Sequence, residues 1–268
     1  MITPFYNVMQ VRDSWDWSQT KKLAPVSDQL ACKASWAISA IETLEAAIAI
    51  RKNVTAADTR ISAQHLIDCD TTNVGCVGGW PARAWKFFQK SGFVAPENYP
   101  YKQYLGAKRQ CLAIRDKSTV QRLDTEFKGR QYVTLKVENL KQLVQLQPLS
   151  VAINAPPCFK LYKSGILSNY DCECTSTSFE EVMVNEIVTI LGFGTTKEED
   201  KEYTYCSGYW IVRPSFGASW GENGTARLCI PRNRELTDFI GTCNVQTYPA
   251  LPDTGMLKSI QNITTVSP

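Results

Sequence analysis

Residues 29–51 read QLACKASWAISAIETLEAAIAIR, and this stretch sets the structural frame of the whole sequence. Its second part, residues 35–51, is rich in Ala, Ile, Leu and Glu and has no Gly or Pro, which predicts a helix. The segment is apolar on nearly every side, as is typical of a buried helix. The dipole and free N–H groups at a helix start stabilise negative charge, so Ser35 lies at a site suited to an anion.

The composition is that of a globular protein with disulfides. The chain has 268 residues, 44% of them hydrophobic and 21% charged, which suits one large domain or two small ones. Its net charge of +3 is too small to indicate binding to nucleic acid or to an anionic membrane, and no apolar stretch predicts a membrane span. Ten cysteines indicate an oxidising compartment. The single histidine, His65, excludes a histidine-rich metal centre, and we expect no metal and no cofactor.

The periodicity of the chain changes near residue 120. Before this point, further helices are expected over residues 62–69 and 82–90. After it, one more helix is expected over residues 138–146, together with strand-like runs at 150–153, 187–191 and 209–212. A helical first half followed by a strand-rich second half predicts the α+β class with two lobes.

Five short motifs occur in a fixed order along the chain. They are QLACKASWA at 29–37, LIDCD at 66–70, GCVGG at 75–79, YPY at 99–101, and WGENG at 220–224 after YWIV at 209–212. Together they resemble the papain-like cysteine peptidases, the cathepsin family. The resemblance covers residues 15–250 and implies a helical lobe and a β-barrel lobe with a substrate cleft between them.

The resemblance also implies a division of the chain. We expect an N-terminal segment at 1–14 as a propeptide remnant, a helical lobe at 15–125, a β-barrel lobe at 126–250 and a C-terminal tail at 251–268. The start of the chain lacks the pattern of a signal peptide. The cysteines and the sequons predict a protein that is secreted or in the endolysosomal or vacuolar lumen, with its leader already removed. Asn53 and Asn262 are the expected glycosylation sites.

The catalytic positions depart from the family pattern. The resemblance aligns Ser35 with the nucleophilic Cys, Glu186 with the His and Pro214 with the Asn that orients it, while Gln29 keeps the oxyanion position. A serine hydroxyl needs a positioned base, and proline has neither a polar side chain nor an N–H with which to orient one. We therefore expect a non-catalytic pseudo-peptidase, not an enzyme, that binds a peptide or protein partner.

Two alternatives stay open at this point. A hydrolase with rebuilt chemistry would use Ser35 as the nucleophile and Glu186 as the base, with burial raising the pKa of the carboxyl group. A structural or adhesive component of a larger assembly would use the fold as a spacer.

The resemblance places seven residues around the cleft: Gly78, Gly79, Trp80, Pro81, Ala152, Ile187 and Trp220. Gly78 and Gly79 match residues whose backbone pairs with an extended peptide, a contact that needs no catalytic group. Ile187 is bulkier than the small residue usual at its position, which leaves open whether the cleft is partly filled.

The resemblance implies a set of disulfides. Two of them are Cys32–Cys76 and Cys69–Cys111, and Cys243 pairs with either Cys172 or Cys174. Beyond the family pattern, Cys206 and Cys229 flank the final hairpin, and Cys158 would pair with the leftover cysteine. His65, one helical turn before Cys69, is expected to be a partly exposed helix residue beside a disulfide, not a metal ligand.

Overall fold

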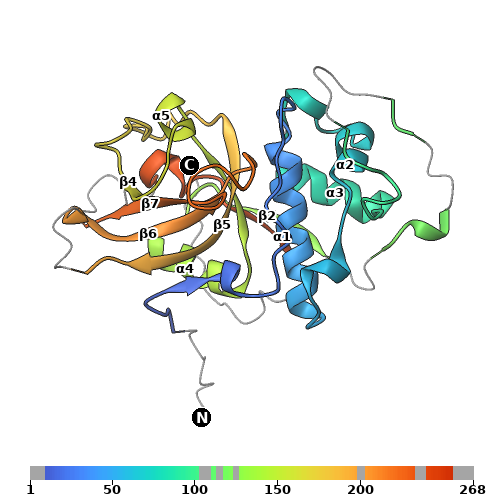
Figure 1. The fold of residues 1–268 in the computed structure, drawn as a ribbon, viewed down its shortest axis with the longest axis horizontal. Coiled ribbons are helices and arrows are strands. Elements are labelled where there is room, and N and C mark those ends of the chain that lie inside the picture. Colours follow the sequence, from blue (N-terminus) through green and yellow to red (C-terminus); the bar gives the residue numbers. More distant parts are fainter. Residues whose placement is uncertain are drawn as a thin grey trace, which may run out of the picture.

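The computed structural model describes residues 10–102, 110–112, 117–122, 127–197, 203–232 and 240–255. Figure 1 shows a sheet on one side of the molecule and α2 (Ala63–Cys69) and α3 (Pro81–Ser91) on the other, with α1 (Ser35–Arg51) between the sheet and these two helices. The α+β fold with two lobes is confirmed. The predicted boundaries of the lobes and of the terminal segments stay a prediction.

The helical lobe is built around α1, whose residues are buried over nearly its whole length, as the sequence predicts. The other elements of this lobe are α2 (Ala63–Cys69), α3 (Pro81–Ser91) and the 3₁₀ turns η2 (Ala56–Thr59) and η3 (Gly75–Val77). The turn η1 (Trp17–Gln19) lies against the sheet lobe instead, where the Trp17 indole N–H donates to the Val144 carbonyl at 2.6 Å. Local chemistry sets the helix ends. The Ser62 side chain accepts a hydrogen bond from the His65 N–H at the start of α2, and Gly92, with a φ of 71°, ends α3.

The strands of the described residues form one sheet in the order β2-β8-β3-β5-β6-β7-β4, with β1 paired to β5. These strands are β1 (Trp15–Asp16), β2 (Lys128–Gln131), β3 (Leu149–Ile153), β4 (Ile166–Leu167), β5 (Glu186–Thr195), β6 (Cys206–Arg213), β7 (Ala226–Pro231) and β8 (Ala250–Asp253). The connecting elements are η4 (Lys117–Thr119), α4 (Val137–Leu146), α5 (Pro157–Lys160) and η6 (Thr242–Asn244).

Strand β5 is the centre of this sheet and is buried from its second residue to its ninth. Its register against β6 shifts between Ile190 and Gly192. A Cβ atom on Gly192 would lie 2.1 Å from the Trp15 carbonyl oxygen, so only glycine allows β1 to approach β5 here. The first residue of this strand is Glu186, which therefore projects from a rigid element.

Two apolar clusters form the core. One lies within the sheet lobe and contains large side chains such as Leu140, Phe193 and Trp210. The other surrounds α1 and contains Trp36 and Trp85 together with strand residues that reach across from the sheet. Those strand residues are Ala152, Ile187 and Ala250. The two lobes therefore share apolar packing along α1.

A buried polar joint also connects the lobes. The Ser39 hydroxyl donates to the Ser150 Oγ at 2.8 Å and lies 3.0 Å from the Thr189 Oγ1. Thr189 donates to Glu42 Oε2 at 2.8 Å, and a guanidinium nitrogen of Arg213 lies 3.8 Å from Glu42 Oε1. Burial raises the pKa of Glu42, although Arg213 and Thr189 oppose this shift.

All ten cysteines are paired, and the structure settles the pairing that the sequence left open. The bonds are Cys32–Cys76, Cys69–Cys111, Cys158–Cys172, Cys174–Cys243 and Cys206–Cys229. The implied bridges are confirmed, with Cys174 as the partner of Cys243 and Cys172 as the partner of Cys158.

The expectation of a partly exposed His65 is wrong. The residue is only 3% exposed, and its ring lies 5.4 Å from the Phe87 ring and 5.5 Å from the Tyr99 ring, measured between centroids. Burial lowers the pKa of this histidine, which favours the neutral imidazole. His65 is thus a packing residue of the helical lobe.

Candidate active site

A cleft of about 800 Å³ lies where the amino-terminal end of α1 faces the first residues of β5. The predicted residues that line it are Gly78, Gly79, Trp80, Ile187 and Trp220. The other two predicted cleft residues, Pro81 and Ala152, are buried in the interior instead. The lining also includes Gln29, Ser35 and Glu186, so three of the four expected site residues meet in one cavity.

Ser35 is the first residue of α1 and is 8% exposed. Its Oγ accepts a hydrogen bond from the Ile187 N–H at 3.3 Å, a contact that joins the two lobes. No side chain caps the start of α1, and its first turn contains no acidic residue. The N–H groups and the dipole of this 17-residue helix are therefore available to stabilise negative charge beside Ser35.

Hydrogen bonds to its backbone N–H and carbonyl groups hold Gln29 in place. Its N–H donates to the Ser215 carbonyl at 2.9 Å, and its carbonyl accepts from the Cys32 N–H at 3.2 Å and from the Tyr101 hydroxyl at 3.0 Å. Gly79 supports the same wall, because a Cβ atom there would lie 2.7 Å from the Trp36 ring. The backbone of Gln29 is thus held in place by hydrogen bonds from three directions.

Glu186 approaches Ser35 from the sheet lobe. The residue before it, Asn185, donates its N–H to the Ile153 carbonyl at 3.0 Å and accepts the Ala155 N–H on its side-chain oxygen at 2.8 Å. Burial raises the pKa of Glu186, while the neighbouring Ser35 and Gln29 side chains oppose this shift. Among the described residues, no hydrogen-bond donor is in position for its buried Oε1.

Pro214 does not join this group. It follows the end of β6, is buried and is absent from the cleft lining. The structure therefore brings together Gln29, Ser35 and Glu186 but places no orienting group at position 214.

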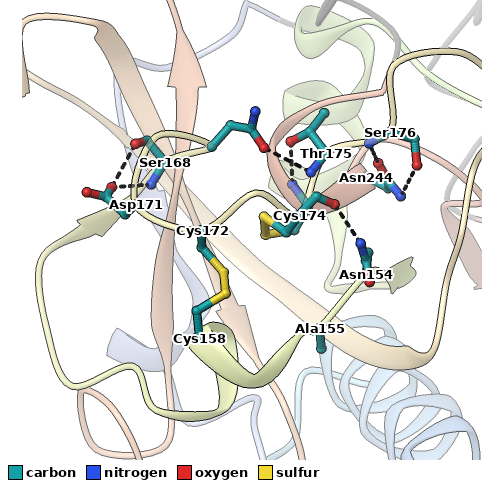
Figure 2. Close-up of a disulfide and its surroundings, with 12 residues drawn as sticks. Asn154, Ala155, Cys158, Ser168, Asp171, Cys172, Cys174, Thr175, Ser176 and Asn244 are labelled. Carbon is teal, nitrogen blue, oxygen red and sulfur yellow. Dashed lines mark hydrogen bonds between the residues drawn. A yellow bond between two sulfur atoms is a disulfide. The ribbon is translucent and has the colours of Figure 1, made fainter.

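Sequence analysis missed the support of the segment that leads into Glu186. The Asn244 amide oxygen accepts the Ser176 N–H at 2.8 Å, and its nitrogen donates to the Met183 carbonyl at 2.8 Å. Figure 2 shows Asn244 beside Ser176, near the Asn154 amide that donates to the Cys174 carbonyl at 3.0 Å. These asparagines belong to no motif in the sequence, so only the folded structure identifies them.

Proteins of similar sequence and structure indicate the family to which this fold and cleft belong. Residues 11–252 match the sequence profile of papain family cysteine proteases. The chain belongs to the papain family. It is 34% identical over 246 residues to cysteine proteinase RD21A of Arabidopsis thaliana, and 34% identical over 252 residues to vignain of Phaseolus vulgaris. These alignments cover 91% and 92% of this chain, but only 47% and 61% of the relatives.

Solved structures show the same fold. Bromelain from Ananas comosus in complex with the E64 inhibitor superposes with a TM-score of 0.69 at 29% identity, over 91% of this chain and 99% of bromelain. The papain-like two-lobe fold that the sequence motifs imply is therefore confirmed.

The comparisons correct one expectation. The chain was expected to be a non-catalytic pseudo-peptidase and not an enzyme. Similar proteins are instead named as a cysteine proteinase and, for bromelain, as a protease, which points to protease function for this fold. The expectation of an inactive protein rested on the replacements at Ser35, Glu186 and Pro214. Two of these residues, Ser35 and Glu186, line the same cleft as Gln29.

In the described part of the chain, no helix is long and apolar enough to cross a lipid bilayer.

Proposed function

We propose that this chain hydrolyses peptide bonds, with Ser35 as the nucleophile, Glu186 as the general base and Gln29 as an oxyanion donor. The observation that carries the proposal is that Ser35 and Glu186 meet from opposite lobes in one cleft. The printed names of cysteine proteinase RD21A and bromelain protease support protease function, although they describe those proteins and not this one.

The nucleophile at this position is a hydroxyl and not a thiol. All ten cysteines form disulfides, so the chain has no thiol for a thiolate mechanism. A serine hydroxyl depends on a nearby base, and a carboxylate becomes a better base as burial raises its pKa toward neutrality. Glu186 combines such burial with a position beside Ser35.

The reaction then follows from the positions of the groups. The Ser35 Oγ attacks the peptide carbonyl carbon while its proton passes to Glu186. The oxyanion forms at the start of α1, where the Gln29 amide and backbone N–H groups donate to it. Glu186 returns the proton to the departing amine as the C–N bond breaks. It then takes a proton from a water molecule that attacks the Ser35 ester, and it gives that proton to the Ser35 Oγ as the acyl–oxygen bond breaks and the acid product leaves.

Hydrolysis of a quenched-fluorescence peptide library tests the proposal. We expect the wild-type protein to cleave, Ser35→Ala to be silent, and Glu186→Gln to lose a factor on the order of 10²–10⁴ in rate. Ser91→Ala makes the same change at an exposed position at the end of α3 and should cleave like wild type. A wild-type protein that stays silent where papain cleaves overturns the proposal.

We also propose that the protein is glycosylated and is located outside the cell or in the endolysosomal or vacuolar lumen. Five disulfides support an oxidising compartment. Asn53 is exposed and lies in a sequon, whereas Asn262 lies outside the described residues. Enzymatic deglycosylation of the native protein should lower its mass, and Asn53→Gln should reduce that shift. An unchanged mass contradicts glycosylation.

A further inference from the structure

Two lysines flank the reacting centre from opposite walls of the cleft. Lys33 lies two residues before Ser35 in the helical lobe, and its N–H donates to the Cys76 carbonyl at 3.2 Å. Lys160 is the last residue of α5 in the sheet lobe, and its carbonyl accepts the Trp220 indole N–H at 2.8 Å. Both backbones are thus fixed, while both side chains are exposed and line the cleft.

Among the residues that the structure describes, neither ammonium group belongs to an ion pair. The ion pairs of the described residues all involve arginine, and none includes Lys33 or Lys160. Lys160 interacts with Glu186 only through the longer-range attraction that lowers the pKa of that carboxyl group. Each lysine is therefore available to a carboxylate of an incoming peptide.

Two acidic residues also line the cleft, exposed Asp28 and the largely buried Glu186. Asp28 Oδ1 accepts the Leu30 N–H at 2.7 Å, and Glu186 lies buried beside Ser35 and Gln29. Two further carboxylates, Glu180 and Glu181, line a separate depression, where Glu181 accepts a hydrogen bond from Thr177 at 2.6 Å. Lys33 and Lys160 are thus the exposed cationic side chains among the described lining residues, one on each wall.

We infer that the cleft selects extended peptides that carry Asp or Glu side chains on both sides of the backbone near the reacting bond, one held by Lys33 and one by Lys160. The inference rests on the proposed function for the position of the bond, but not for the charge preference. Successive side chains of an extended peptide point in opposite directions. Acidic residues separated by an odd number of positions therefore reach the two walls at once.

Peptide binding, measured without turnover, tests the inference. The probe is a fluorescein-labelled octapeptide with two adjacent Glu residues at its centre, compared by anisotropy with the same peptide carrying Gln, both on the Ser35→Ala background. We expect the Glu peptide to bind about tenfold more tightly at low salt, with the preference shrinking at about 1 M salt. Lys33→Gln or Lys160→Gln should each lower this preference about threefold, and the double variant should abolish it.

Lys163→Gln is the matched control, since it removes one positive charge from an exposed residue that does not line the cleft. Equal binding of the two peptides, no binding of either, or an equal loss in Lys163→Gln overturns the inference. A silent peptide library with the binding preference intact overturns the hydrolase proposal alone. Cleavage without a preference for acidic peptides overturns the inference alone.

Discussion

Removal of the Cys32–Cys76 disulfide by a double change to alanine is expected to lower the free energy of unfolding by about 4 kcal/mol. The two residues are 44 positions apart in sequence, and a cross-link across a loop of this length removes much of the conformational freedom of the unfolded chain. Cys32 is 2% exposed, so the change also leaves a small void in the α1 core. Urea unfolding measured against the wild-type protein gives the difference.

The matched control is the Cys206–Cys229 bridge. Its partners are 23 residues apart and lie on β6 and β7, which are already joined by backbone pairing. We expect its removal to cost less stability and to leave peptide binding unchanged, because it lies away from the cleft. The Cys32–Cys76 bridge instead connects the segment of Gln29 to the wall of Gly78, so its loss should also weaken peptide binding. Equal effects of the two double variants would contradict this assignment.

The second large effect is a pH dependence that Glu45 contributes. Its side chain is 2% exposed, and its Oε1 accepts the Ile61 N–H at 2.6 Å and lies 3.4 Å from Arg60 Nε. Burial raises the pKa of Glu45 from 4.5 to about 8, although Arg60 and the Ile61 N–H oppose this shift. The native carboxyl group therefore keeps its proton across a pH range in which the unfolded one has lost it.

The sign of the effect follows from proton binding. Between pH 4.5 and about 8, the native state binds more protons at Glu45 than the unfolded state does. The stabilising contribution is complete below pH 4.5 and is lost as the pH rises through this window, by up to about 1.4 kcal/mol per pH unit. Buried Glu42, whose pKa is also raised, adds to the same trend.

Glu45→Gln keeps an acceptor for Ile61 and removes the titrating group. We expect the variant to lose much of the decline in unfolding free energy between pH 5 and pH 8, a change on the order of 3 kcal/mol. Glu97→Gln makes the same substitution at an exposed loop position and serves as the control. Denaturant unfolding across this pH range measures both, and parallel curves for Glu45→Gln and wild type would refute the assignment.

Local pattern was sufficient to predict much of the fold. The helix at 35–51 has the same bounds in the structure, because composition alone favours it and no Gly or Pro interrupts it. The strand beginning near residue 187 was predicted too short. It runs over Glu186–Thr195, since pairing with β6 and β1 extends it through a glycine-rich stretch that local preference reads as a loop.

The site was harder to predict because its geometry is non-local. The family resemblance grouped Gln29, Ser35 and Glu186 in one site, but local sequence gives neither their burial nor their contacts, which depend on how the two lobes pack. No motif singled out Lys33 or Lys160, since an exposed lysine usually indicates only a solvated surface. The prediction that His65 is partly exposed was wrong because Phe87 and Tyr99, which bury it, lie far from it in sequence.

The polar joint between the lobes has a consequence for how they dock. A shift of α1 by one turn against β5 would separate Ser39 and Glu42 from Ser150 and Thr189 and strand several buried polar groups without partners. Apolar packing alone tolerates such slippage far better than matched hydrogen bonds do. The polar joint therefore favours one docking geometry of the two lobes. The same geometry brings Ser35, at the start of α1, next to Glu186 at the start of β5.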